Sequence, residues 1–226
     1  NVYQKRTERR LPLVRFVELR SVGPGGHPGA AAGGAAVIEH EREGDVHVLR
    51  MVNGENKIDP AFLARLDALL DAVEAESTGP CALVLTGEGK FFNNGIDLAA
   101  VGQLEEKDVL AFGAEFQRLG VRLARFPVPT VAAINGHAFA GGAVIAMACD
   151  FRVMRKDRGW ICFSEVDVGV PLPPALMNVV RSKLTPNVAR DALLTGHRCA
   201  RRSTPPSSST PSRRASSIGA LPRRRC

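Results

Sequence analysis

The sequence has few aromatic residues, no paired cysteine motif and no long apolar run. Aromatics make up 5% of the 226 residues, which leaves little for a surface that stacks nucleic-acid bases. The five cysteines are scattered without a Cys-x-x-Cys pair, so neither a zinc ribbon nor a disulfide scaffold is expected. No apolar run approaches the roughly 20 residues of a membrane helix, and the first residues do not read as a signal peptide.

Several catalytic motifs are missing as well. The sequence contains no Gly-x-Gly-x-x-Gly, and the run Gly87-Glu88-Gly89-Lys90 lacks the hydroxyl residue and the helix of a phosphate-binding loop. It contains no Gly-x-Ser-x-Gly elbow of a serine hydrolase. The histidines at 27, 40, 47 and 197 show no metal-ligand spacing with cysteine or with one another. Nucleotide binding, serine hydrolysis and a metal centre are therefore not predicted.

The net charge of +7 is confined to the two ends of the chain. Residues 199–226 carry +7 and residues 1–20 carry +4, so the stretch between them carries −4. This distribution argues against a nucleic-acid-binding domain. We expect residues 1–36 and the Ser/Arg/Pro-rich residues 199–226 to be disordered, around a folded core over 37–198. Because the first methionine is Met51, we interpret the chain as a fragment or a translation with non-native flanks.

Strands and helices alternate along the core, which predicts an α/β fold with mostly parallel strands. Asp59 and Pro60 are typical of a helix start, and apolar residues at helical spacing follow them. The predicted strands are 46–52, 81–85, 130–134, 151–154 and 161–163. The predicted helices are one beginning at 60 and others over 105–125, 142–148, 174–183 and 186–194.

Two glycine-containing loops, 91–98 and 135–142, each follow a buried strand. Glycine lets the backbone approach a ligand, and a helix N-terminus presents unpaired N–H groups. Two such groups aimed at one point would form an oxyanion hole. The alternative is that both loops are merely tight turns.

Glu165 lies in an apolar segment that we read as a strand leading into a turn. A carboxyl group among apolar neighbours loses hydration, so its pKa should rise toward that of a useful acid or base. The alternative is a solvent-facing Glu on an edge strand, with Asp167 as the local competitor. We expect His137 to be a turn or packing residue, and Asp97 and Asp150 to be turn or cap residues.

These elements, taken together and in order, resemble the enoyl-CoA hydratase/isomerase (crotonase) superfamily. The resemblance is carried by LVLTGEGKFFNNGIDL at 83–98, PVPTVAAINGHAFAGGAVIAMACDFRV at 127–153 and FSEVDVGVPLP at 163–173. Within that family the wording is closest to plant 3-enoyl-CoA isomerases. The implied fold is a crotonase-like β-β-α spiral, whose first hairpin would lie in the stretch before residue 60 and which commonly assembles into trimers.

The resemblance also implies the site. The substrate would be an acyl-CoA, whose thioester oxygen would receive the N–H groups of Ile96 and Gly141. Glu165 would be the catalytic residue. No metal and no cofactor would be needed beyond the coenzyme A of the substrate. The other substrate-binding positions implied are Lys57, Ile58, Asn94, Gly95, Gly142 and Val144.

The acid/base positions favour one reaction. A hydratase of this family uses two glutamates, and the first of these positions is occupied here by Val144. Moving a double bond needs only one base, so the resemblance implies a 3-enoyl-CoA to 2-enoyl-CoA isomerase of unsaturated fatty-acid oxidation. The alternatives are hydration or thioester hydrolysis, with Asp167 as the residue to test, and a truncated, non-catalytic protein.

The sequence departs from the family after Arg198, where the Ser/Arg/Pro-rich tail replaces the usual C-terminal helices. We expect this loss to leave the chain marginally stable and to weaken activity and trimer formation. The resemblance implies a peroxisomal location. No targeting signal is visible, and a cytoplasmic location is the alternative.

Overall fold

The computed structural model describes residues 37–155 and 157–199. The expectations made for residues 1–36 and for residues 200–226 lie outside this part of the chain. Within it, strands and helices alternate, and most neighbouring strands pair in parallel, which confirms the α/β prediction.

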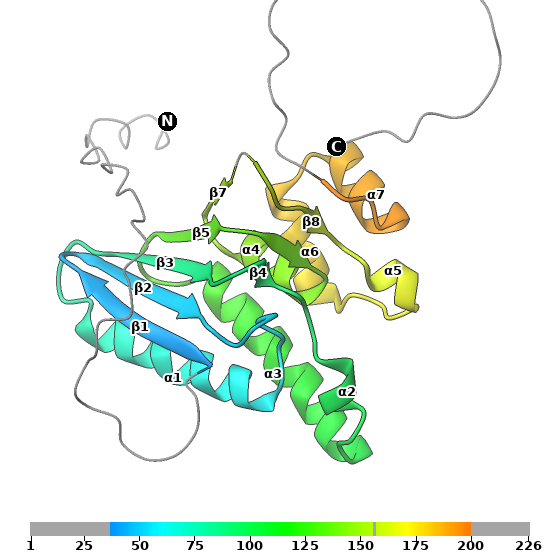
Figure 1. Ribbon diagram of the computed structural model, residues 1–226, viewed down its shortest axis with the longest axis horizontal. Helices are drawn as coiled ribbons and strands as arrows, with labels where there is room; N and C mark the ends of the chain where they lie inside the picture. Colours follow the sequence, from blue (N-terminus) through cyan, green and yellow to red (C-terminus); the bar gives the residue numbers. More distant parts are fainter. Residues whose placement is uncertain (1–36, 156, 200–226) are drawn as a thin grey trace, which may run out of the picture. The chain divides into compact units, whose positions relative to one another are not determined.

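The strands form two sheets that are built by one repeating unit (Figure 1). Both strands of the first unit join the five-stranded sheet; in each later unit one strand joins that sheet, the next joins the three-stranded sheet, and a helical segment follows. The larger sheet has the order β1-β2-β3-β5-β7, with bounds Ile38–Glu43, Val46–Met51, Ala82–Gly87, Thr130–Ile134 and Phe151–Met154. The smaller has the order β4-β6-β8, with bounds Phe91–Asn93, His137–Phe139 and Ile161–Cys162. The β-β-α spiral implied by the resemblance is thus present.

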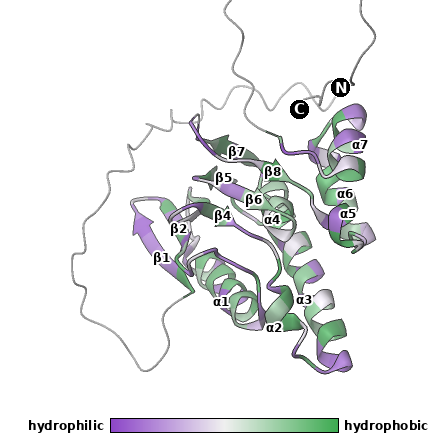
Figure 2. Cartoon of the chain, turned by 45° about the vertical axis from the view of Figure 1, so that its right-hand side comes forward, coloured by the Kyte–Doolittle hydropathy of each residue, from purple (hydrophilic) through white to green (hydrophobic). Residues whose placement is uncertain are grey.

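Among the paired strands of the described residues, β1 and β2 pair antiparallel and the others pair in parallel. Strand β1 lies at the sheet edge and is drawn as hydrophilic in Figure 2. Its charged side chains are mostly exposed, which suits an edge that faces water. The inner strands β3 and β5 are short and apolar, as expected of strands covered on both faces.

Helix α1 (Pro60–Glu76) begins where the sequence predicted. Pro60 occupies the first turn, and the Asp59 carboxylate accepts the Phe62 N–H at 2.7 Å. Its apolar face is buried, and α1 packs against α3 (Glu106–Ala124). Helix α3 is likewise amphipathic, with Phe112, Phe116 and Leu119 on its buried side.

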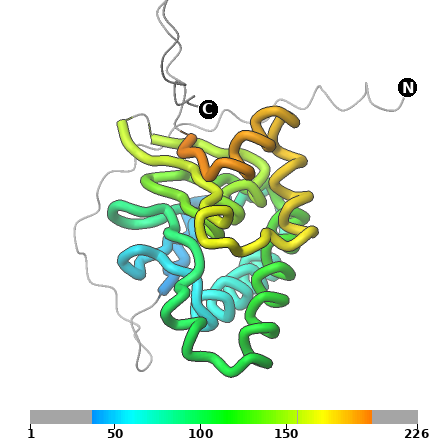
Figure 3. Tube along the Cα trace, turned by 90° about the vertical axis from the view of Figure 1, so that its right-hand side faces the viewer, coloured from blue at the N-terminus to red at the C-terminus, as the bar shows by residue number. Residues whose placement is uncertain are grey.

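Helix α4 (Gly141–Ala148) lies at the centre of the fold, and all eight of its residues are buried. It contacts strands β4 and β6 on one side and helices α3 and α6 (Pro174–Lys183) on the other. A helix that is apolar all round needs this position. Figure 3 shows α6, α7 (Pro186–Thr195) and the short α5 (Glu165–Val168), in yellow to orange, on the side that faces the viewer. After α7 the chain returns to β8, where Ile161 and Cys199 exchange two backbone hydrogen bonds.

The structure corrects several predicted boundaries. The two glycine loops contain the short strands β4 and β6, which the sequence analysis read as loop. Helix α2 (Leu98–Val101) was not predicted, and Glu165 begins a short helix rather than lying between a strand and a turn. Strands of three residues and helices of four are too short to leave a hydrophobic period in the sequence.

No helix in residues 37–155 or 157–199 combines the length and the apolar character needed to cross a membrane.

Candidate active site

The first predicted oxyanion loop, 91–98, pairs with the segment before α1 through a bridge between Ile58 and Ile96. The Ile58 N–H donates to the Gly95 carbonyl at 2.8 Å, and the Ile58 carbonyl accepts the Asp97 N–H at 2.9 Å. In parallel pairing, the residue opposite such a pair directs its own N–H and carbonyl to the other side. The Ile96 N–H therefore faces away from Ile58 and is left for another acceptor.

Gly141 contributes the second N–H because it is the first residue of α4. The first hydrogen bond of this helix is from the Val144 N–H to the Ala140 carbonyl, at 3.1 Å, so the Gly141 N–H has no acceptor within the helix. The two loops are close: a Cβ placed on Gly95 would lie 3.4 Å from the Gly141 nitrogen. A Cβ on Gly141 would lie 3.6 Å from Ile96 Cγ1. The structure thus brings together the loops that the sequence singled out.

Two residues at this junction have positive φ angles, and one of them is not glycine. Gly95 has φ +83°, and Ala140 has φ +45° although it carries a side chain. A non-glycine residue held in this region costs on the order of 1–3 kcal/mol and persists only where the surroundings enforce it. Here the Ala140 N–H donates to the Cys162 carbonyl at 2.8 Å, which extends the pairing of β6 with β8 to the start of α4.

Gly142 allows α4 to approach the end of β4. A Cβ on Gly142 would lie 2.3 Å from the Asn93 carbonyl oxygen and 2.7 Å from Asn93 Oδ1. The same Oδ1 accepts the Gly95 N–H at 2.9 Å. Asn93 is fully buried and therefore fixes the helix N-terminus and the Gly95 turn relative to each other.

Asn56 is a positioning residue that the sequence analysis missed. It is fully buried, has φ +55°, and donates through Nδ2 to the carbonyls of Phe91 (3.0 Å) and Phe92 (3.2 Å). Its Oδ1 accepts the Asn53 N–H at 2.9 Å. These bonds hold the segment before Ile58 against β4. After glycine, Asn is among the residues most often found in this left-handed conformation. That preference is the only feature of the sequence that could have indicated a role for Asn56.

Lys57 and Asn94 lie at the outer edge of this junction. The Glu55 carboxylate accepts from Asn94 Nδ2 at 3.2 Å and pairs with Lys57 Nζ at 3.1 Å. The hydrogen bond with Glu55 raises the pKa of Lys57. Both side chains are thus tied to Glu55 at this edge, whereas Ile58 and Val144 are fully buried.

Glu165 supplies a carboxyl group with an unsatisfied oxygen. Its Oε2 is buried and has no hydrogen-bond partner among the described residues. Burial raises the pKa of Glu165, partly offset by a hydrogen bond from its own backbone N–H. The residue lies three positions after Cys162, whose carbonyl holds Ala140. The pairing of β6 with β8 therefore positions both Gly141 and the segment that carries Glu165.

The competing polar residues have structural partners. Asp167 is exposed on α5, and its carboxylate faces Gly196. Asp97 caps α2, and Asp150 accepts both the backbone N–H and the hydroxyl of Thr130. The His137 ring stacks on Phe139 with centroids 5.3 Å apart, as expected of a packing histidine.

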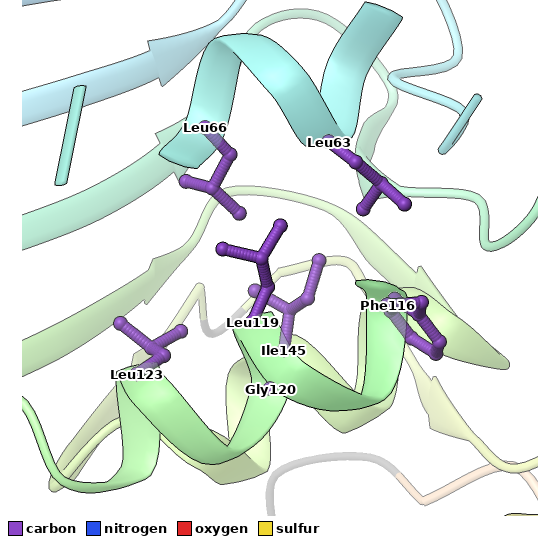
Figure 4. A pocket seen from close by; sticks show the side chains of 7 residues that line it. All are labelled: Leu63, Leu66, Phe116, Leu119, Gly120, Leu123 and Ile145. Carbon is purple, nitrogen blue, oxygen red and sulfur yellow. The ribbon is translucent and has the colours of Figure 1, made fainter. Parts of the chain in front are cut away.

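An apolar cavity lies between α1, α3 and α4 (Figure 4). Phe116 lines it, and the Phe116 ring also lies 3.1 Å from the position a Cβ would take on Gly141. The lining residues are Leu63, Leu66, Phe116, Leu119, Gly120, Leu123 and Ile145. Because no lining residue carries a polar side chain, the cavity is a gap in helix packing and not a second polar site.

The sequence profile of the enoyl-CoA hydratase/isomerase family matches residues 41–202, which is most of the chain. The chain belongs to this family. Enzymes of the family generally act on coenzyme A thioesters.

Curated relatives of this family member include plant isomerases. It is 37% identical over 160 residues to "Enoyl-CoA delta isomerase 2, peroxisomal" of Arabidopsis thaliana, covering 68% of this chain and 67% of that protein. It is 37% identical over 158 residues to "Enoyl-CoA delta isomerase 3" of the same plant, covering 68% of this chain and 66% of that protein. The "Putative enoyl-CoA hydratase" of Thermus thermophilus is 39% identical over 145 residues, covering 62% of this chain and 56% of that protein. The chain thus spans about two thirds of the length of the plant relatives.

Solved structures of enoyl-CoA hydratases share the fold. The probable enoyl-CoA hydratase EchA3 of Mycobacterium tuberculosis matches with a TM-score of 0.67 and 29% identity, covering 72% of this chain and 68% of that one. EchA3 of Mycobacterium ulcerans matches with a TM-score of 0.67 and 29% identity, covering 72% of this chain and 71% of that one. These matches confirm the crotonase-like fold predicted from the sequence.

Proposed function

We propose that this chain moves the double bond of a 3-enoyl-CoA into conjugation with the thioester, giving the 2-enoyl-CoA. The observation that carries the proposal is the combination of a Glu165 carboxyl oxygen that is buried without a partner among the described residues and the apolar Val144 on the central helix. The names of the plant relatives agree with it, since they are enoyl-CoA delta isomerases.

The thioester oxygen would bind between the N–H groups of Ile96 and Gly141. These two groups have no acceptor in the described backbone pairing, and their peptides are held rigidly. Negative charge that develops on the oxygen would be stabilised by both N–H groups and by the positive end of α4. Such preorganised donors are worth about 3–4 kcal/mol of the barrier each in acyl-transfer enzymes.

Glu165 would act as the only base. It would remove a proton from carbon 2 of the substrate, the electrons would spread over the dienolate, and the same carboxylic acid would return the proton at carbon 4. No atom is gained or lost, so one residue suffices. The raised pKa of Glu165 suits both halves of the reaction. It makes the carboxylate a stronger base for removing the proton, and the resulting carboxylic acid still returns the proton to carbon 4.

The surrounding residues would position the coenzyme A thioester. The Ile58–Ile96 bridge, in which the Gly95 carbonyl accepts the Ile58 N–H, directs the Ile96 N–H, and Gly142 lets α4 approach this loop. Lys57 and Asn94 would meet the polar part of the ligand at the outer edge. Two of the plant relatives are named peroxisomal, and we propose the same location, in the oxidation of unsaturated fatty acids, for this protein.

The test is an isomerase assay of the purified chain with 3-hexenoyl-CoA, following the absorbance of the conjugated product. Glu165→Gln removes the base with little change in shape, and we expect activity to fall at least 1000-fold. Asp167→Asn is the matched control, because it removes an exposed carboxylate from the same short helix. We expect the control to retain most of the wild-type rate.

Three outcomes would count against this reaction. Full activity in Glu165→Gln would refute the one-base mechanism. Addition of water to 2-hexenoyl-CoA, without isomerisation of 3-hexenoyl-CoA, would favour a hydratase activity, which is the activity in the name of the Thermus thermophilus relative. Folded wild-type protein that binds the substrate and turns over neither compound would favour a non-catalytic member of the family.

A further inference from the structure

Two histidines and a glutamate converge at the first hairpin, and they share no residue with the candidate active site. His40 lies on β1, His47 on β2 and Glu76 at the last position of α1. His40 Nε2 lies 3.0 Å from His47 Nδ1, and His47 Nδ1 lies 3.8 Å from Glu76 Oε2. One ligand atom from each residue falls within 4.8 Å of the other two.

These separations approach those of ligands around one small cation. Zinc binds imidazole nitrogen at about 2.0–2.1 Å and carboxylate oxygen at about 2.0–2.2 Å in a tetrahedral arrangement. Two ligand atoms of such a site lie about 3.3 Å apart, which follows from these bond lengths and the tetrahedral angle. The pair of histidine nitrogens has nearly this separation, and the Glu76 oxygen, 3.8 Å from one nitrogen and within 4.8 Å of the other, would move inward by about 0.5–1.5 Å to complete the site.

The cluster is anchored on one side and open on the other. His47 is fully buried, so its ring is held in place, and its other nitrogen has no partner among the described residues. His40 is partly buried and Glu76 is exposed, so a metal ion could enter from solvent together with a water as fourth ligand. Two imidazoles with one carboxylate form a ligand set that suits zinc better than magnesium or calcium.

We propose that His40, His47 and Glu76 bind a zinc-type divalent metal ion that ties the first hairpin to the end of α1. Each ligand comes from a different element, and the intervening stretch from 47 to 76 contains the segment that holds Asn56 and Ile58. A bound ion would therefore hold the two ends of this stretch together. The role is structural, because the described residues place no reacting group beside the cluster.

One cation opposes the ion. Arg42 Nη1 lies 3.5 Å from Glu76 Oε2 and competes for the same carboxylate. Arg42 is about half exposed, so it can turn into solvent when a metal ion takes the carboxylate. Removing Arg42 should therefore strengthen metal binding.

The experiment measures zinc binding to the full chain after dialysis against a chelator, by titration calorimetry and thermal unfolding. We expect wild-type protein to gain roughly 5–10 °C in Tm when free zinc exceeds Kd about a hundredfold. His40→Gln and Glu76→Gln should each weaken this binding at least tenfold and abolish most of the gain in Tm. Both side chains reach solvent, so both variants should fold; His47, which is buried, is left unchanged.

Two control variants separate a specific site from general attraction of zinc. Glu41→Gln removes a carboxylate on the same hairpin, which pairs with Arg50, and should leave binding unchanged. Arg42→Gln should bind zinc more tightly than wild type. Zinc binding elsewhere in the chain would persist in all four variants, and binding that is equal in wild type, His40→Gln and Glu76→Gln would overturn the proposal. So would a wild-type chain that takes up no zinc at this site, or weaker binding in Arg42→Gln.

Discussion

Replacing Gly142 by alanine tests how the helix N-terminus is held against the Gly95 turn. The new Cβ would lie 2.3 Å from the Asn93 carbonyl oxygen, and this contact is with backbone. Contacts this short do not occur, so α4 and β4 must move apart by close to 1 Å. Overpacking of this kind costs about 1–3 kcal/mol, or roughly 2–12 °C in Tm for a chain of this size.

The sign of the effect makes the test decisive. Without a clash, alanine in place of glycine in a helix would stabilise the protein by about 0.4–1 kcal/mol. We expect destabilisation instead, together with a loss of isomerase activity of at least tenfold, because Asn93 Oδ1 also holds the Gly95 N–H beside Ile96.

Gly141→Ala is the matched control on the neighbouring residue. Its Cβ would meet Ile58 Cδ1 at 3.0 Å, Phe116 Cζ at 3.1 Å and Ile96 Cγ1 at 3.6 Å. These are side-chain ends, and they can move by a few tenths of an ångström. We therefore expect Gly141→Ala to change stability by less than about 1 kcal/mol. Any change in isomerase activity in Gly141→Ala would show only whether there is room for a methyl group beside the proposed binding site of the thioester oxygen.

The measurement is urea unfolding of both variants and the wild type, followed by fluorescence or circular dichroism, with the isomerase assay in parallel. The reasoning is refuted if Gly142→Ala unfolds at the same or a higher urea concentration than wild type. It is also refuted if Gly141→Ala is the less stable of the two, because the close contact at Gly142 would then have no energetic effect.

Further expectations follow from Glu165 and Asn56. Burial raises the pKa of Glu165 above the ordinary value of 4.5. Because the base must be ionised, the rate should fall on acidification with a midpoint above pH 4.5 in a pH–rate profile. A midpoint at or below pH 4.5 would contradict the assignment of Glu165 as the base. The same raised pKa means that the folded state binds this proton more tightly than the unfolded state, so ionisation above the folded pKa destabilises the fold. Glu165→Gln should therefore stabilise the protein by roughly 0.5–2 kcal/mol at pH 7, and by less near pH 4, in urea unfolding; lower stability at pH 7 would contradict this. Asn56→Ala removes the Nδ2 hydrogen bonds to the buried carbonyls of Phe91 and Phe92 and should cost about 1–3 kcal/mol in urea unfolding. Asn53→Ala, at an exposed neighbour, should change stability by less than about 0.5 kcal/mol.

The longer elements were predictable from the sequence because each buries a face. The apolar period from Phe62 to Val73, together with the cap at Asp59, predicted α1 and its start. The short apolar run 130–134 predicted an inner strand, which is β5. Both signals are local, since hydrophobic spacing and capping act within a few residues of the chain. The order of the glycine loops and Glu165 also sufficed to suggest the family that the comparisons confirm.

The tertiary structure alone decided how these pieces meet. That Ile58 lies beside Ile96, and that Asn56 holds β4, depends on pairings between residues more than 30 positions apart. His40 and His47 show no metal-ligand spacing in the sequence, because they approach each other only across a hairpin. The helical setting of Glu165 was likewise hidden, because four residues cannot display a period. Local sequence determines which segments are apolar and where they start and end, whereas strand pairing over long separations determines which polar groups share a site.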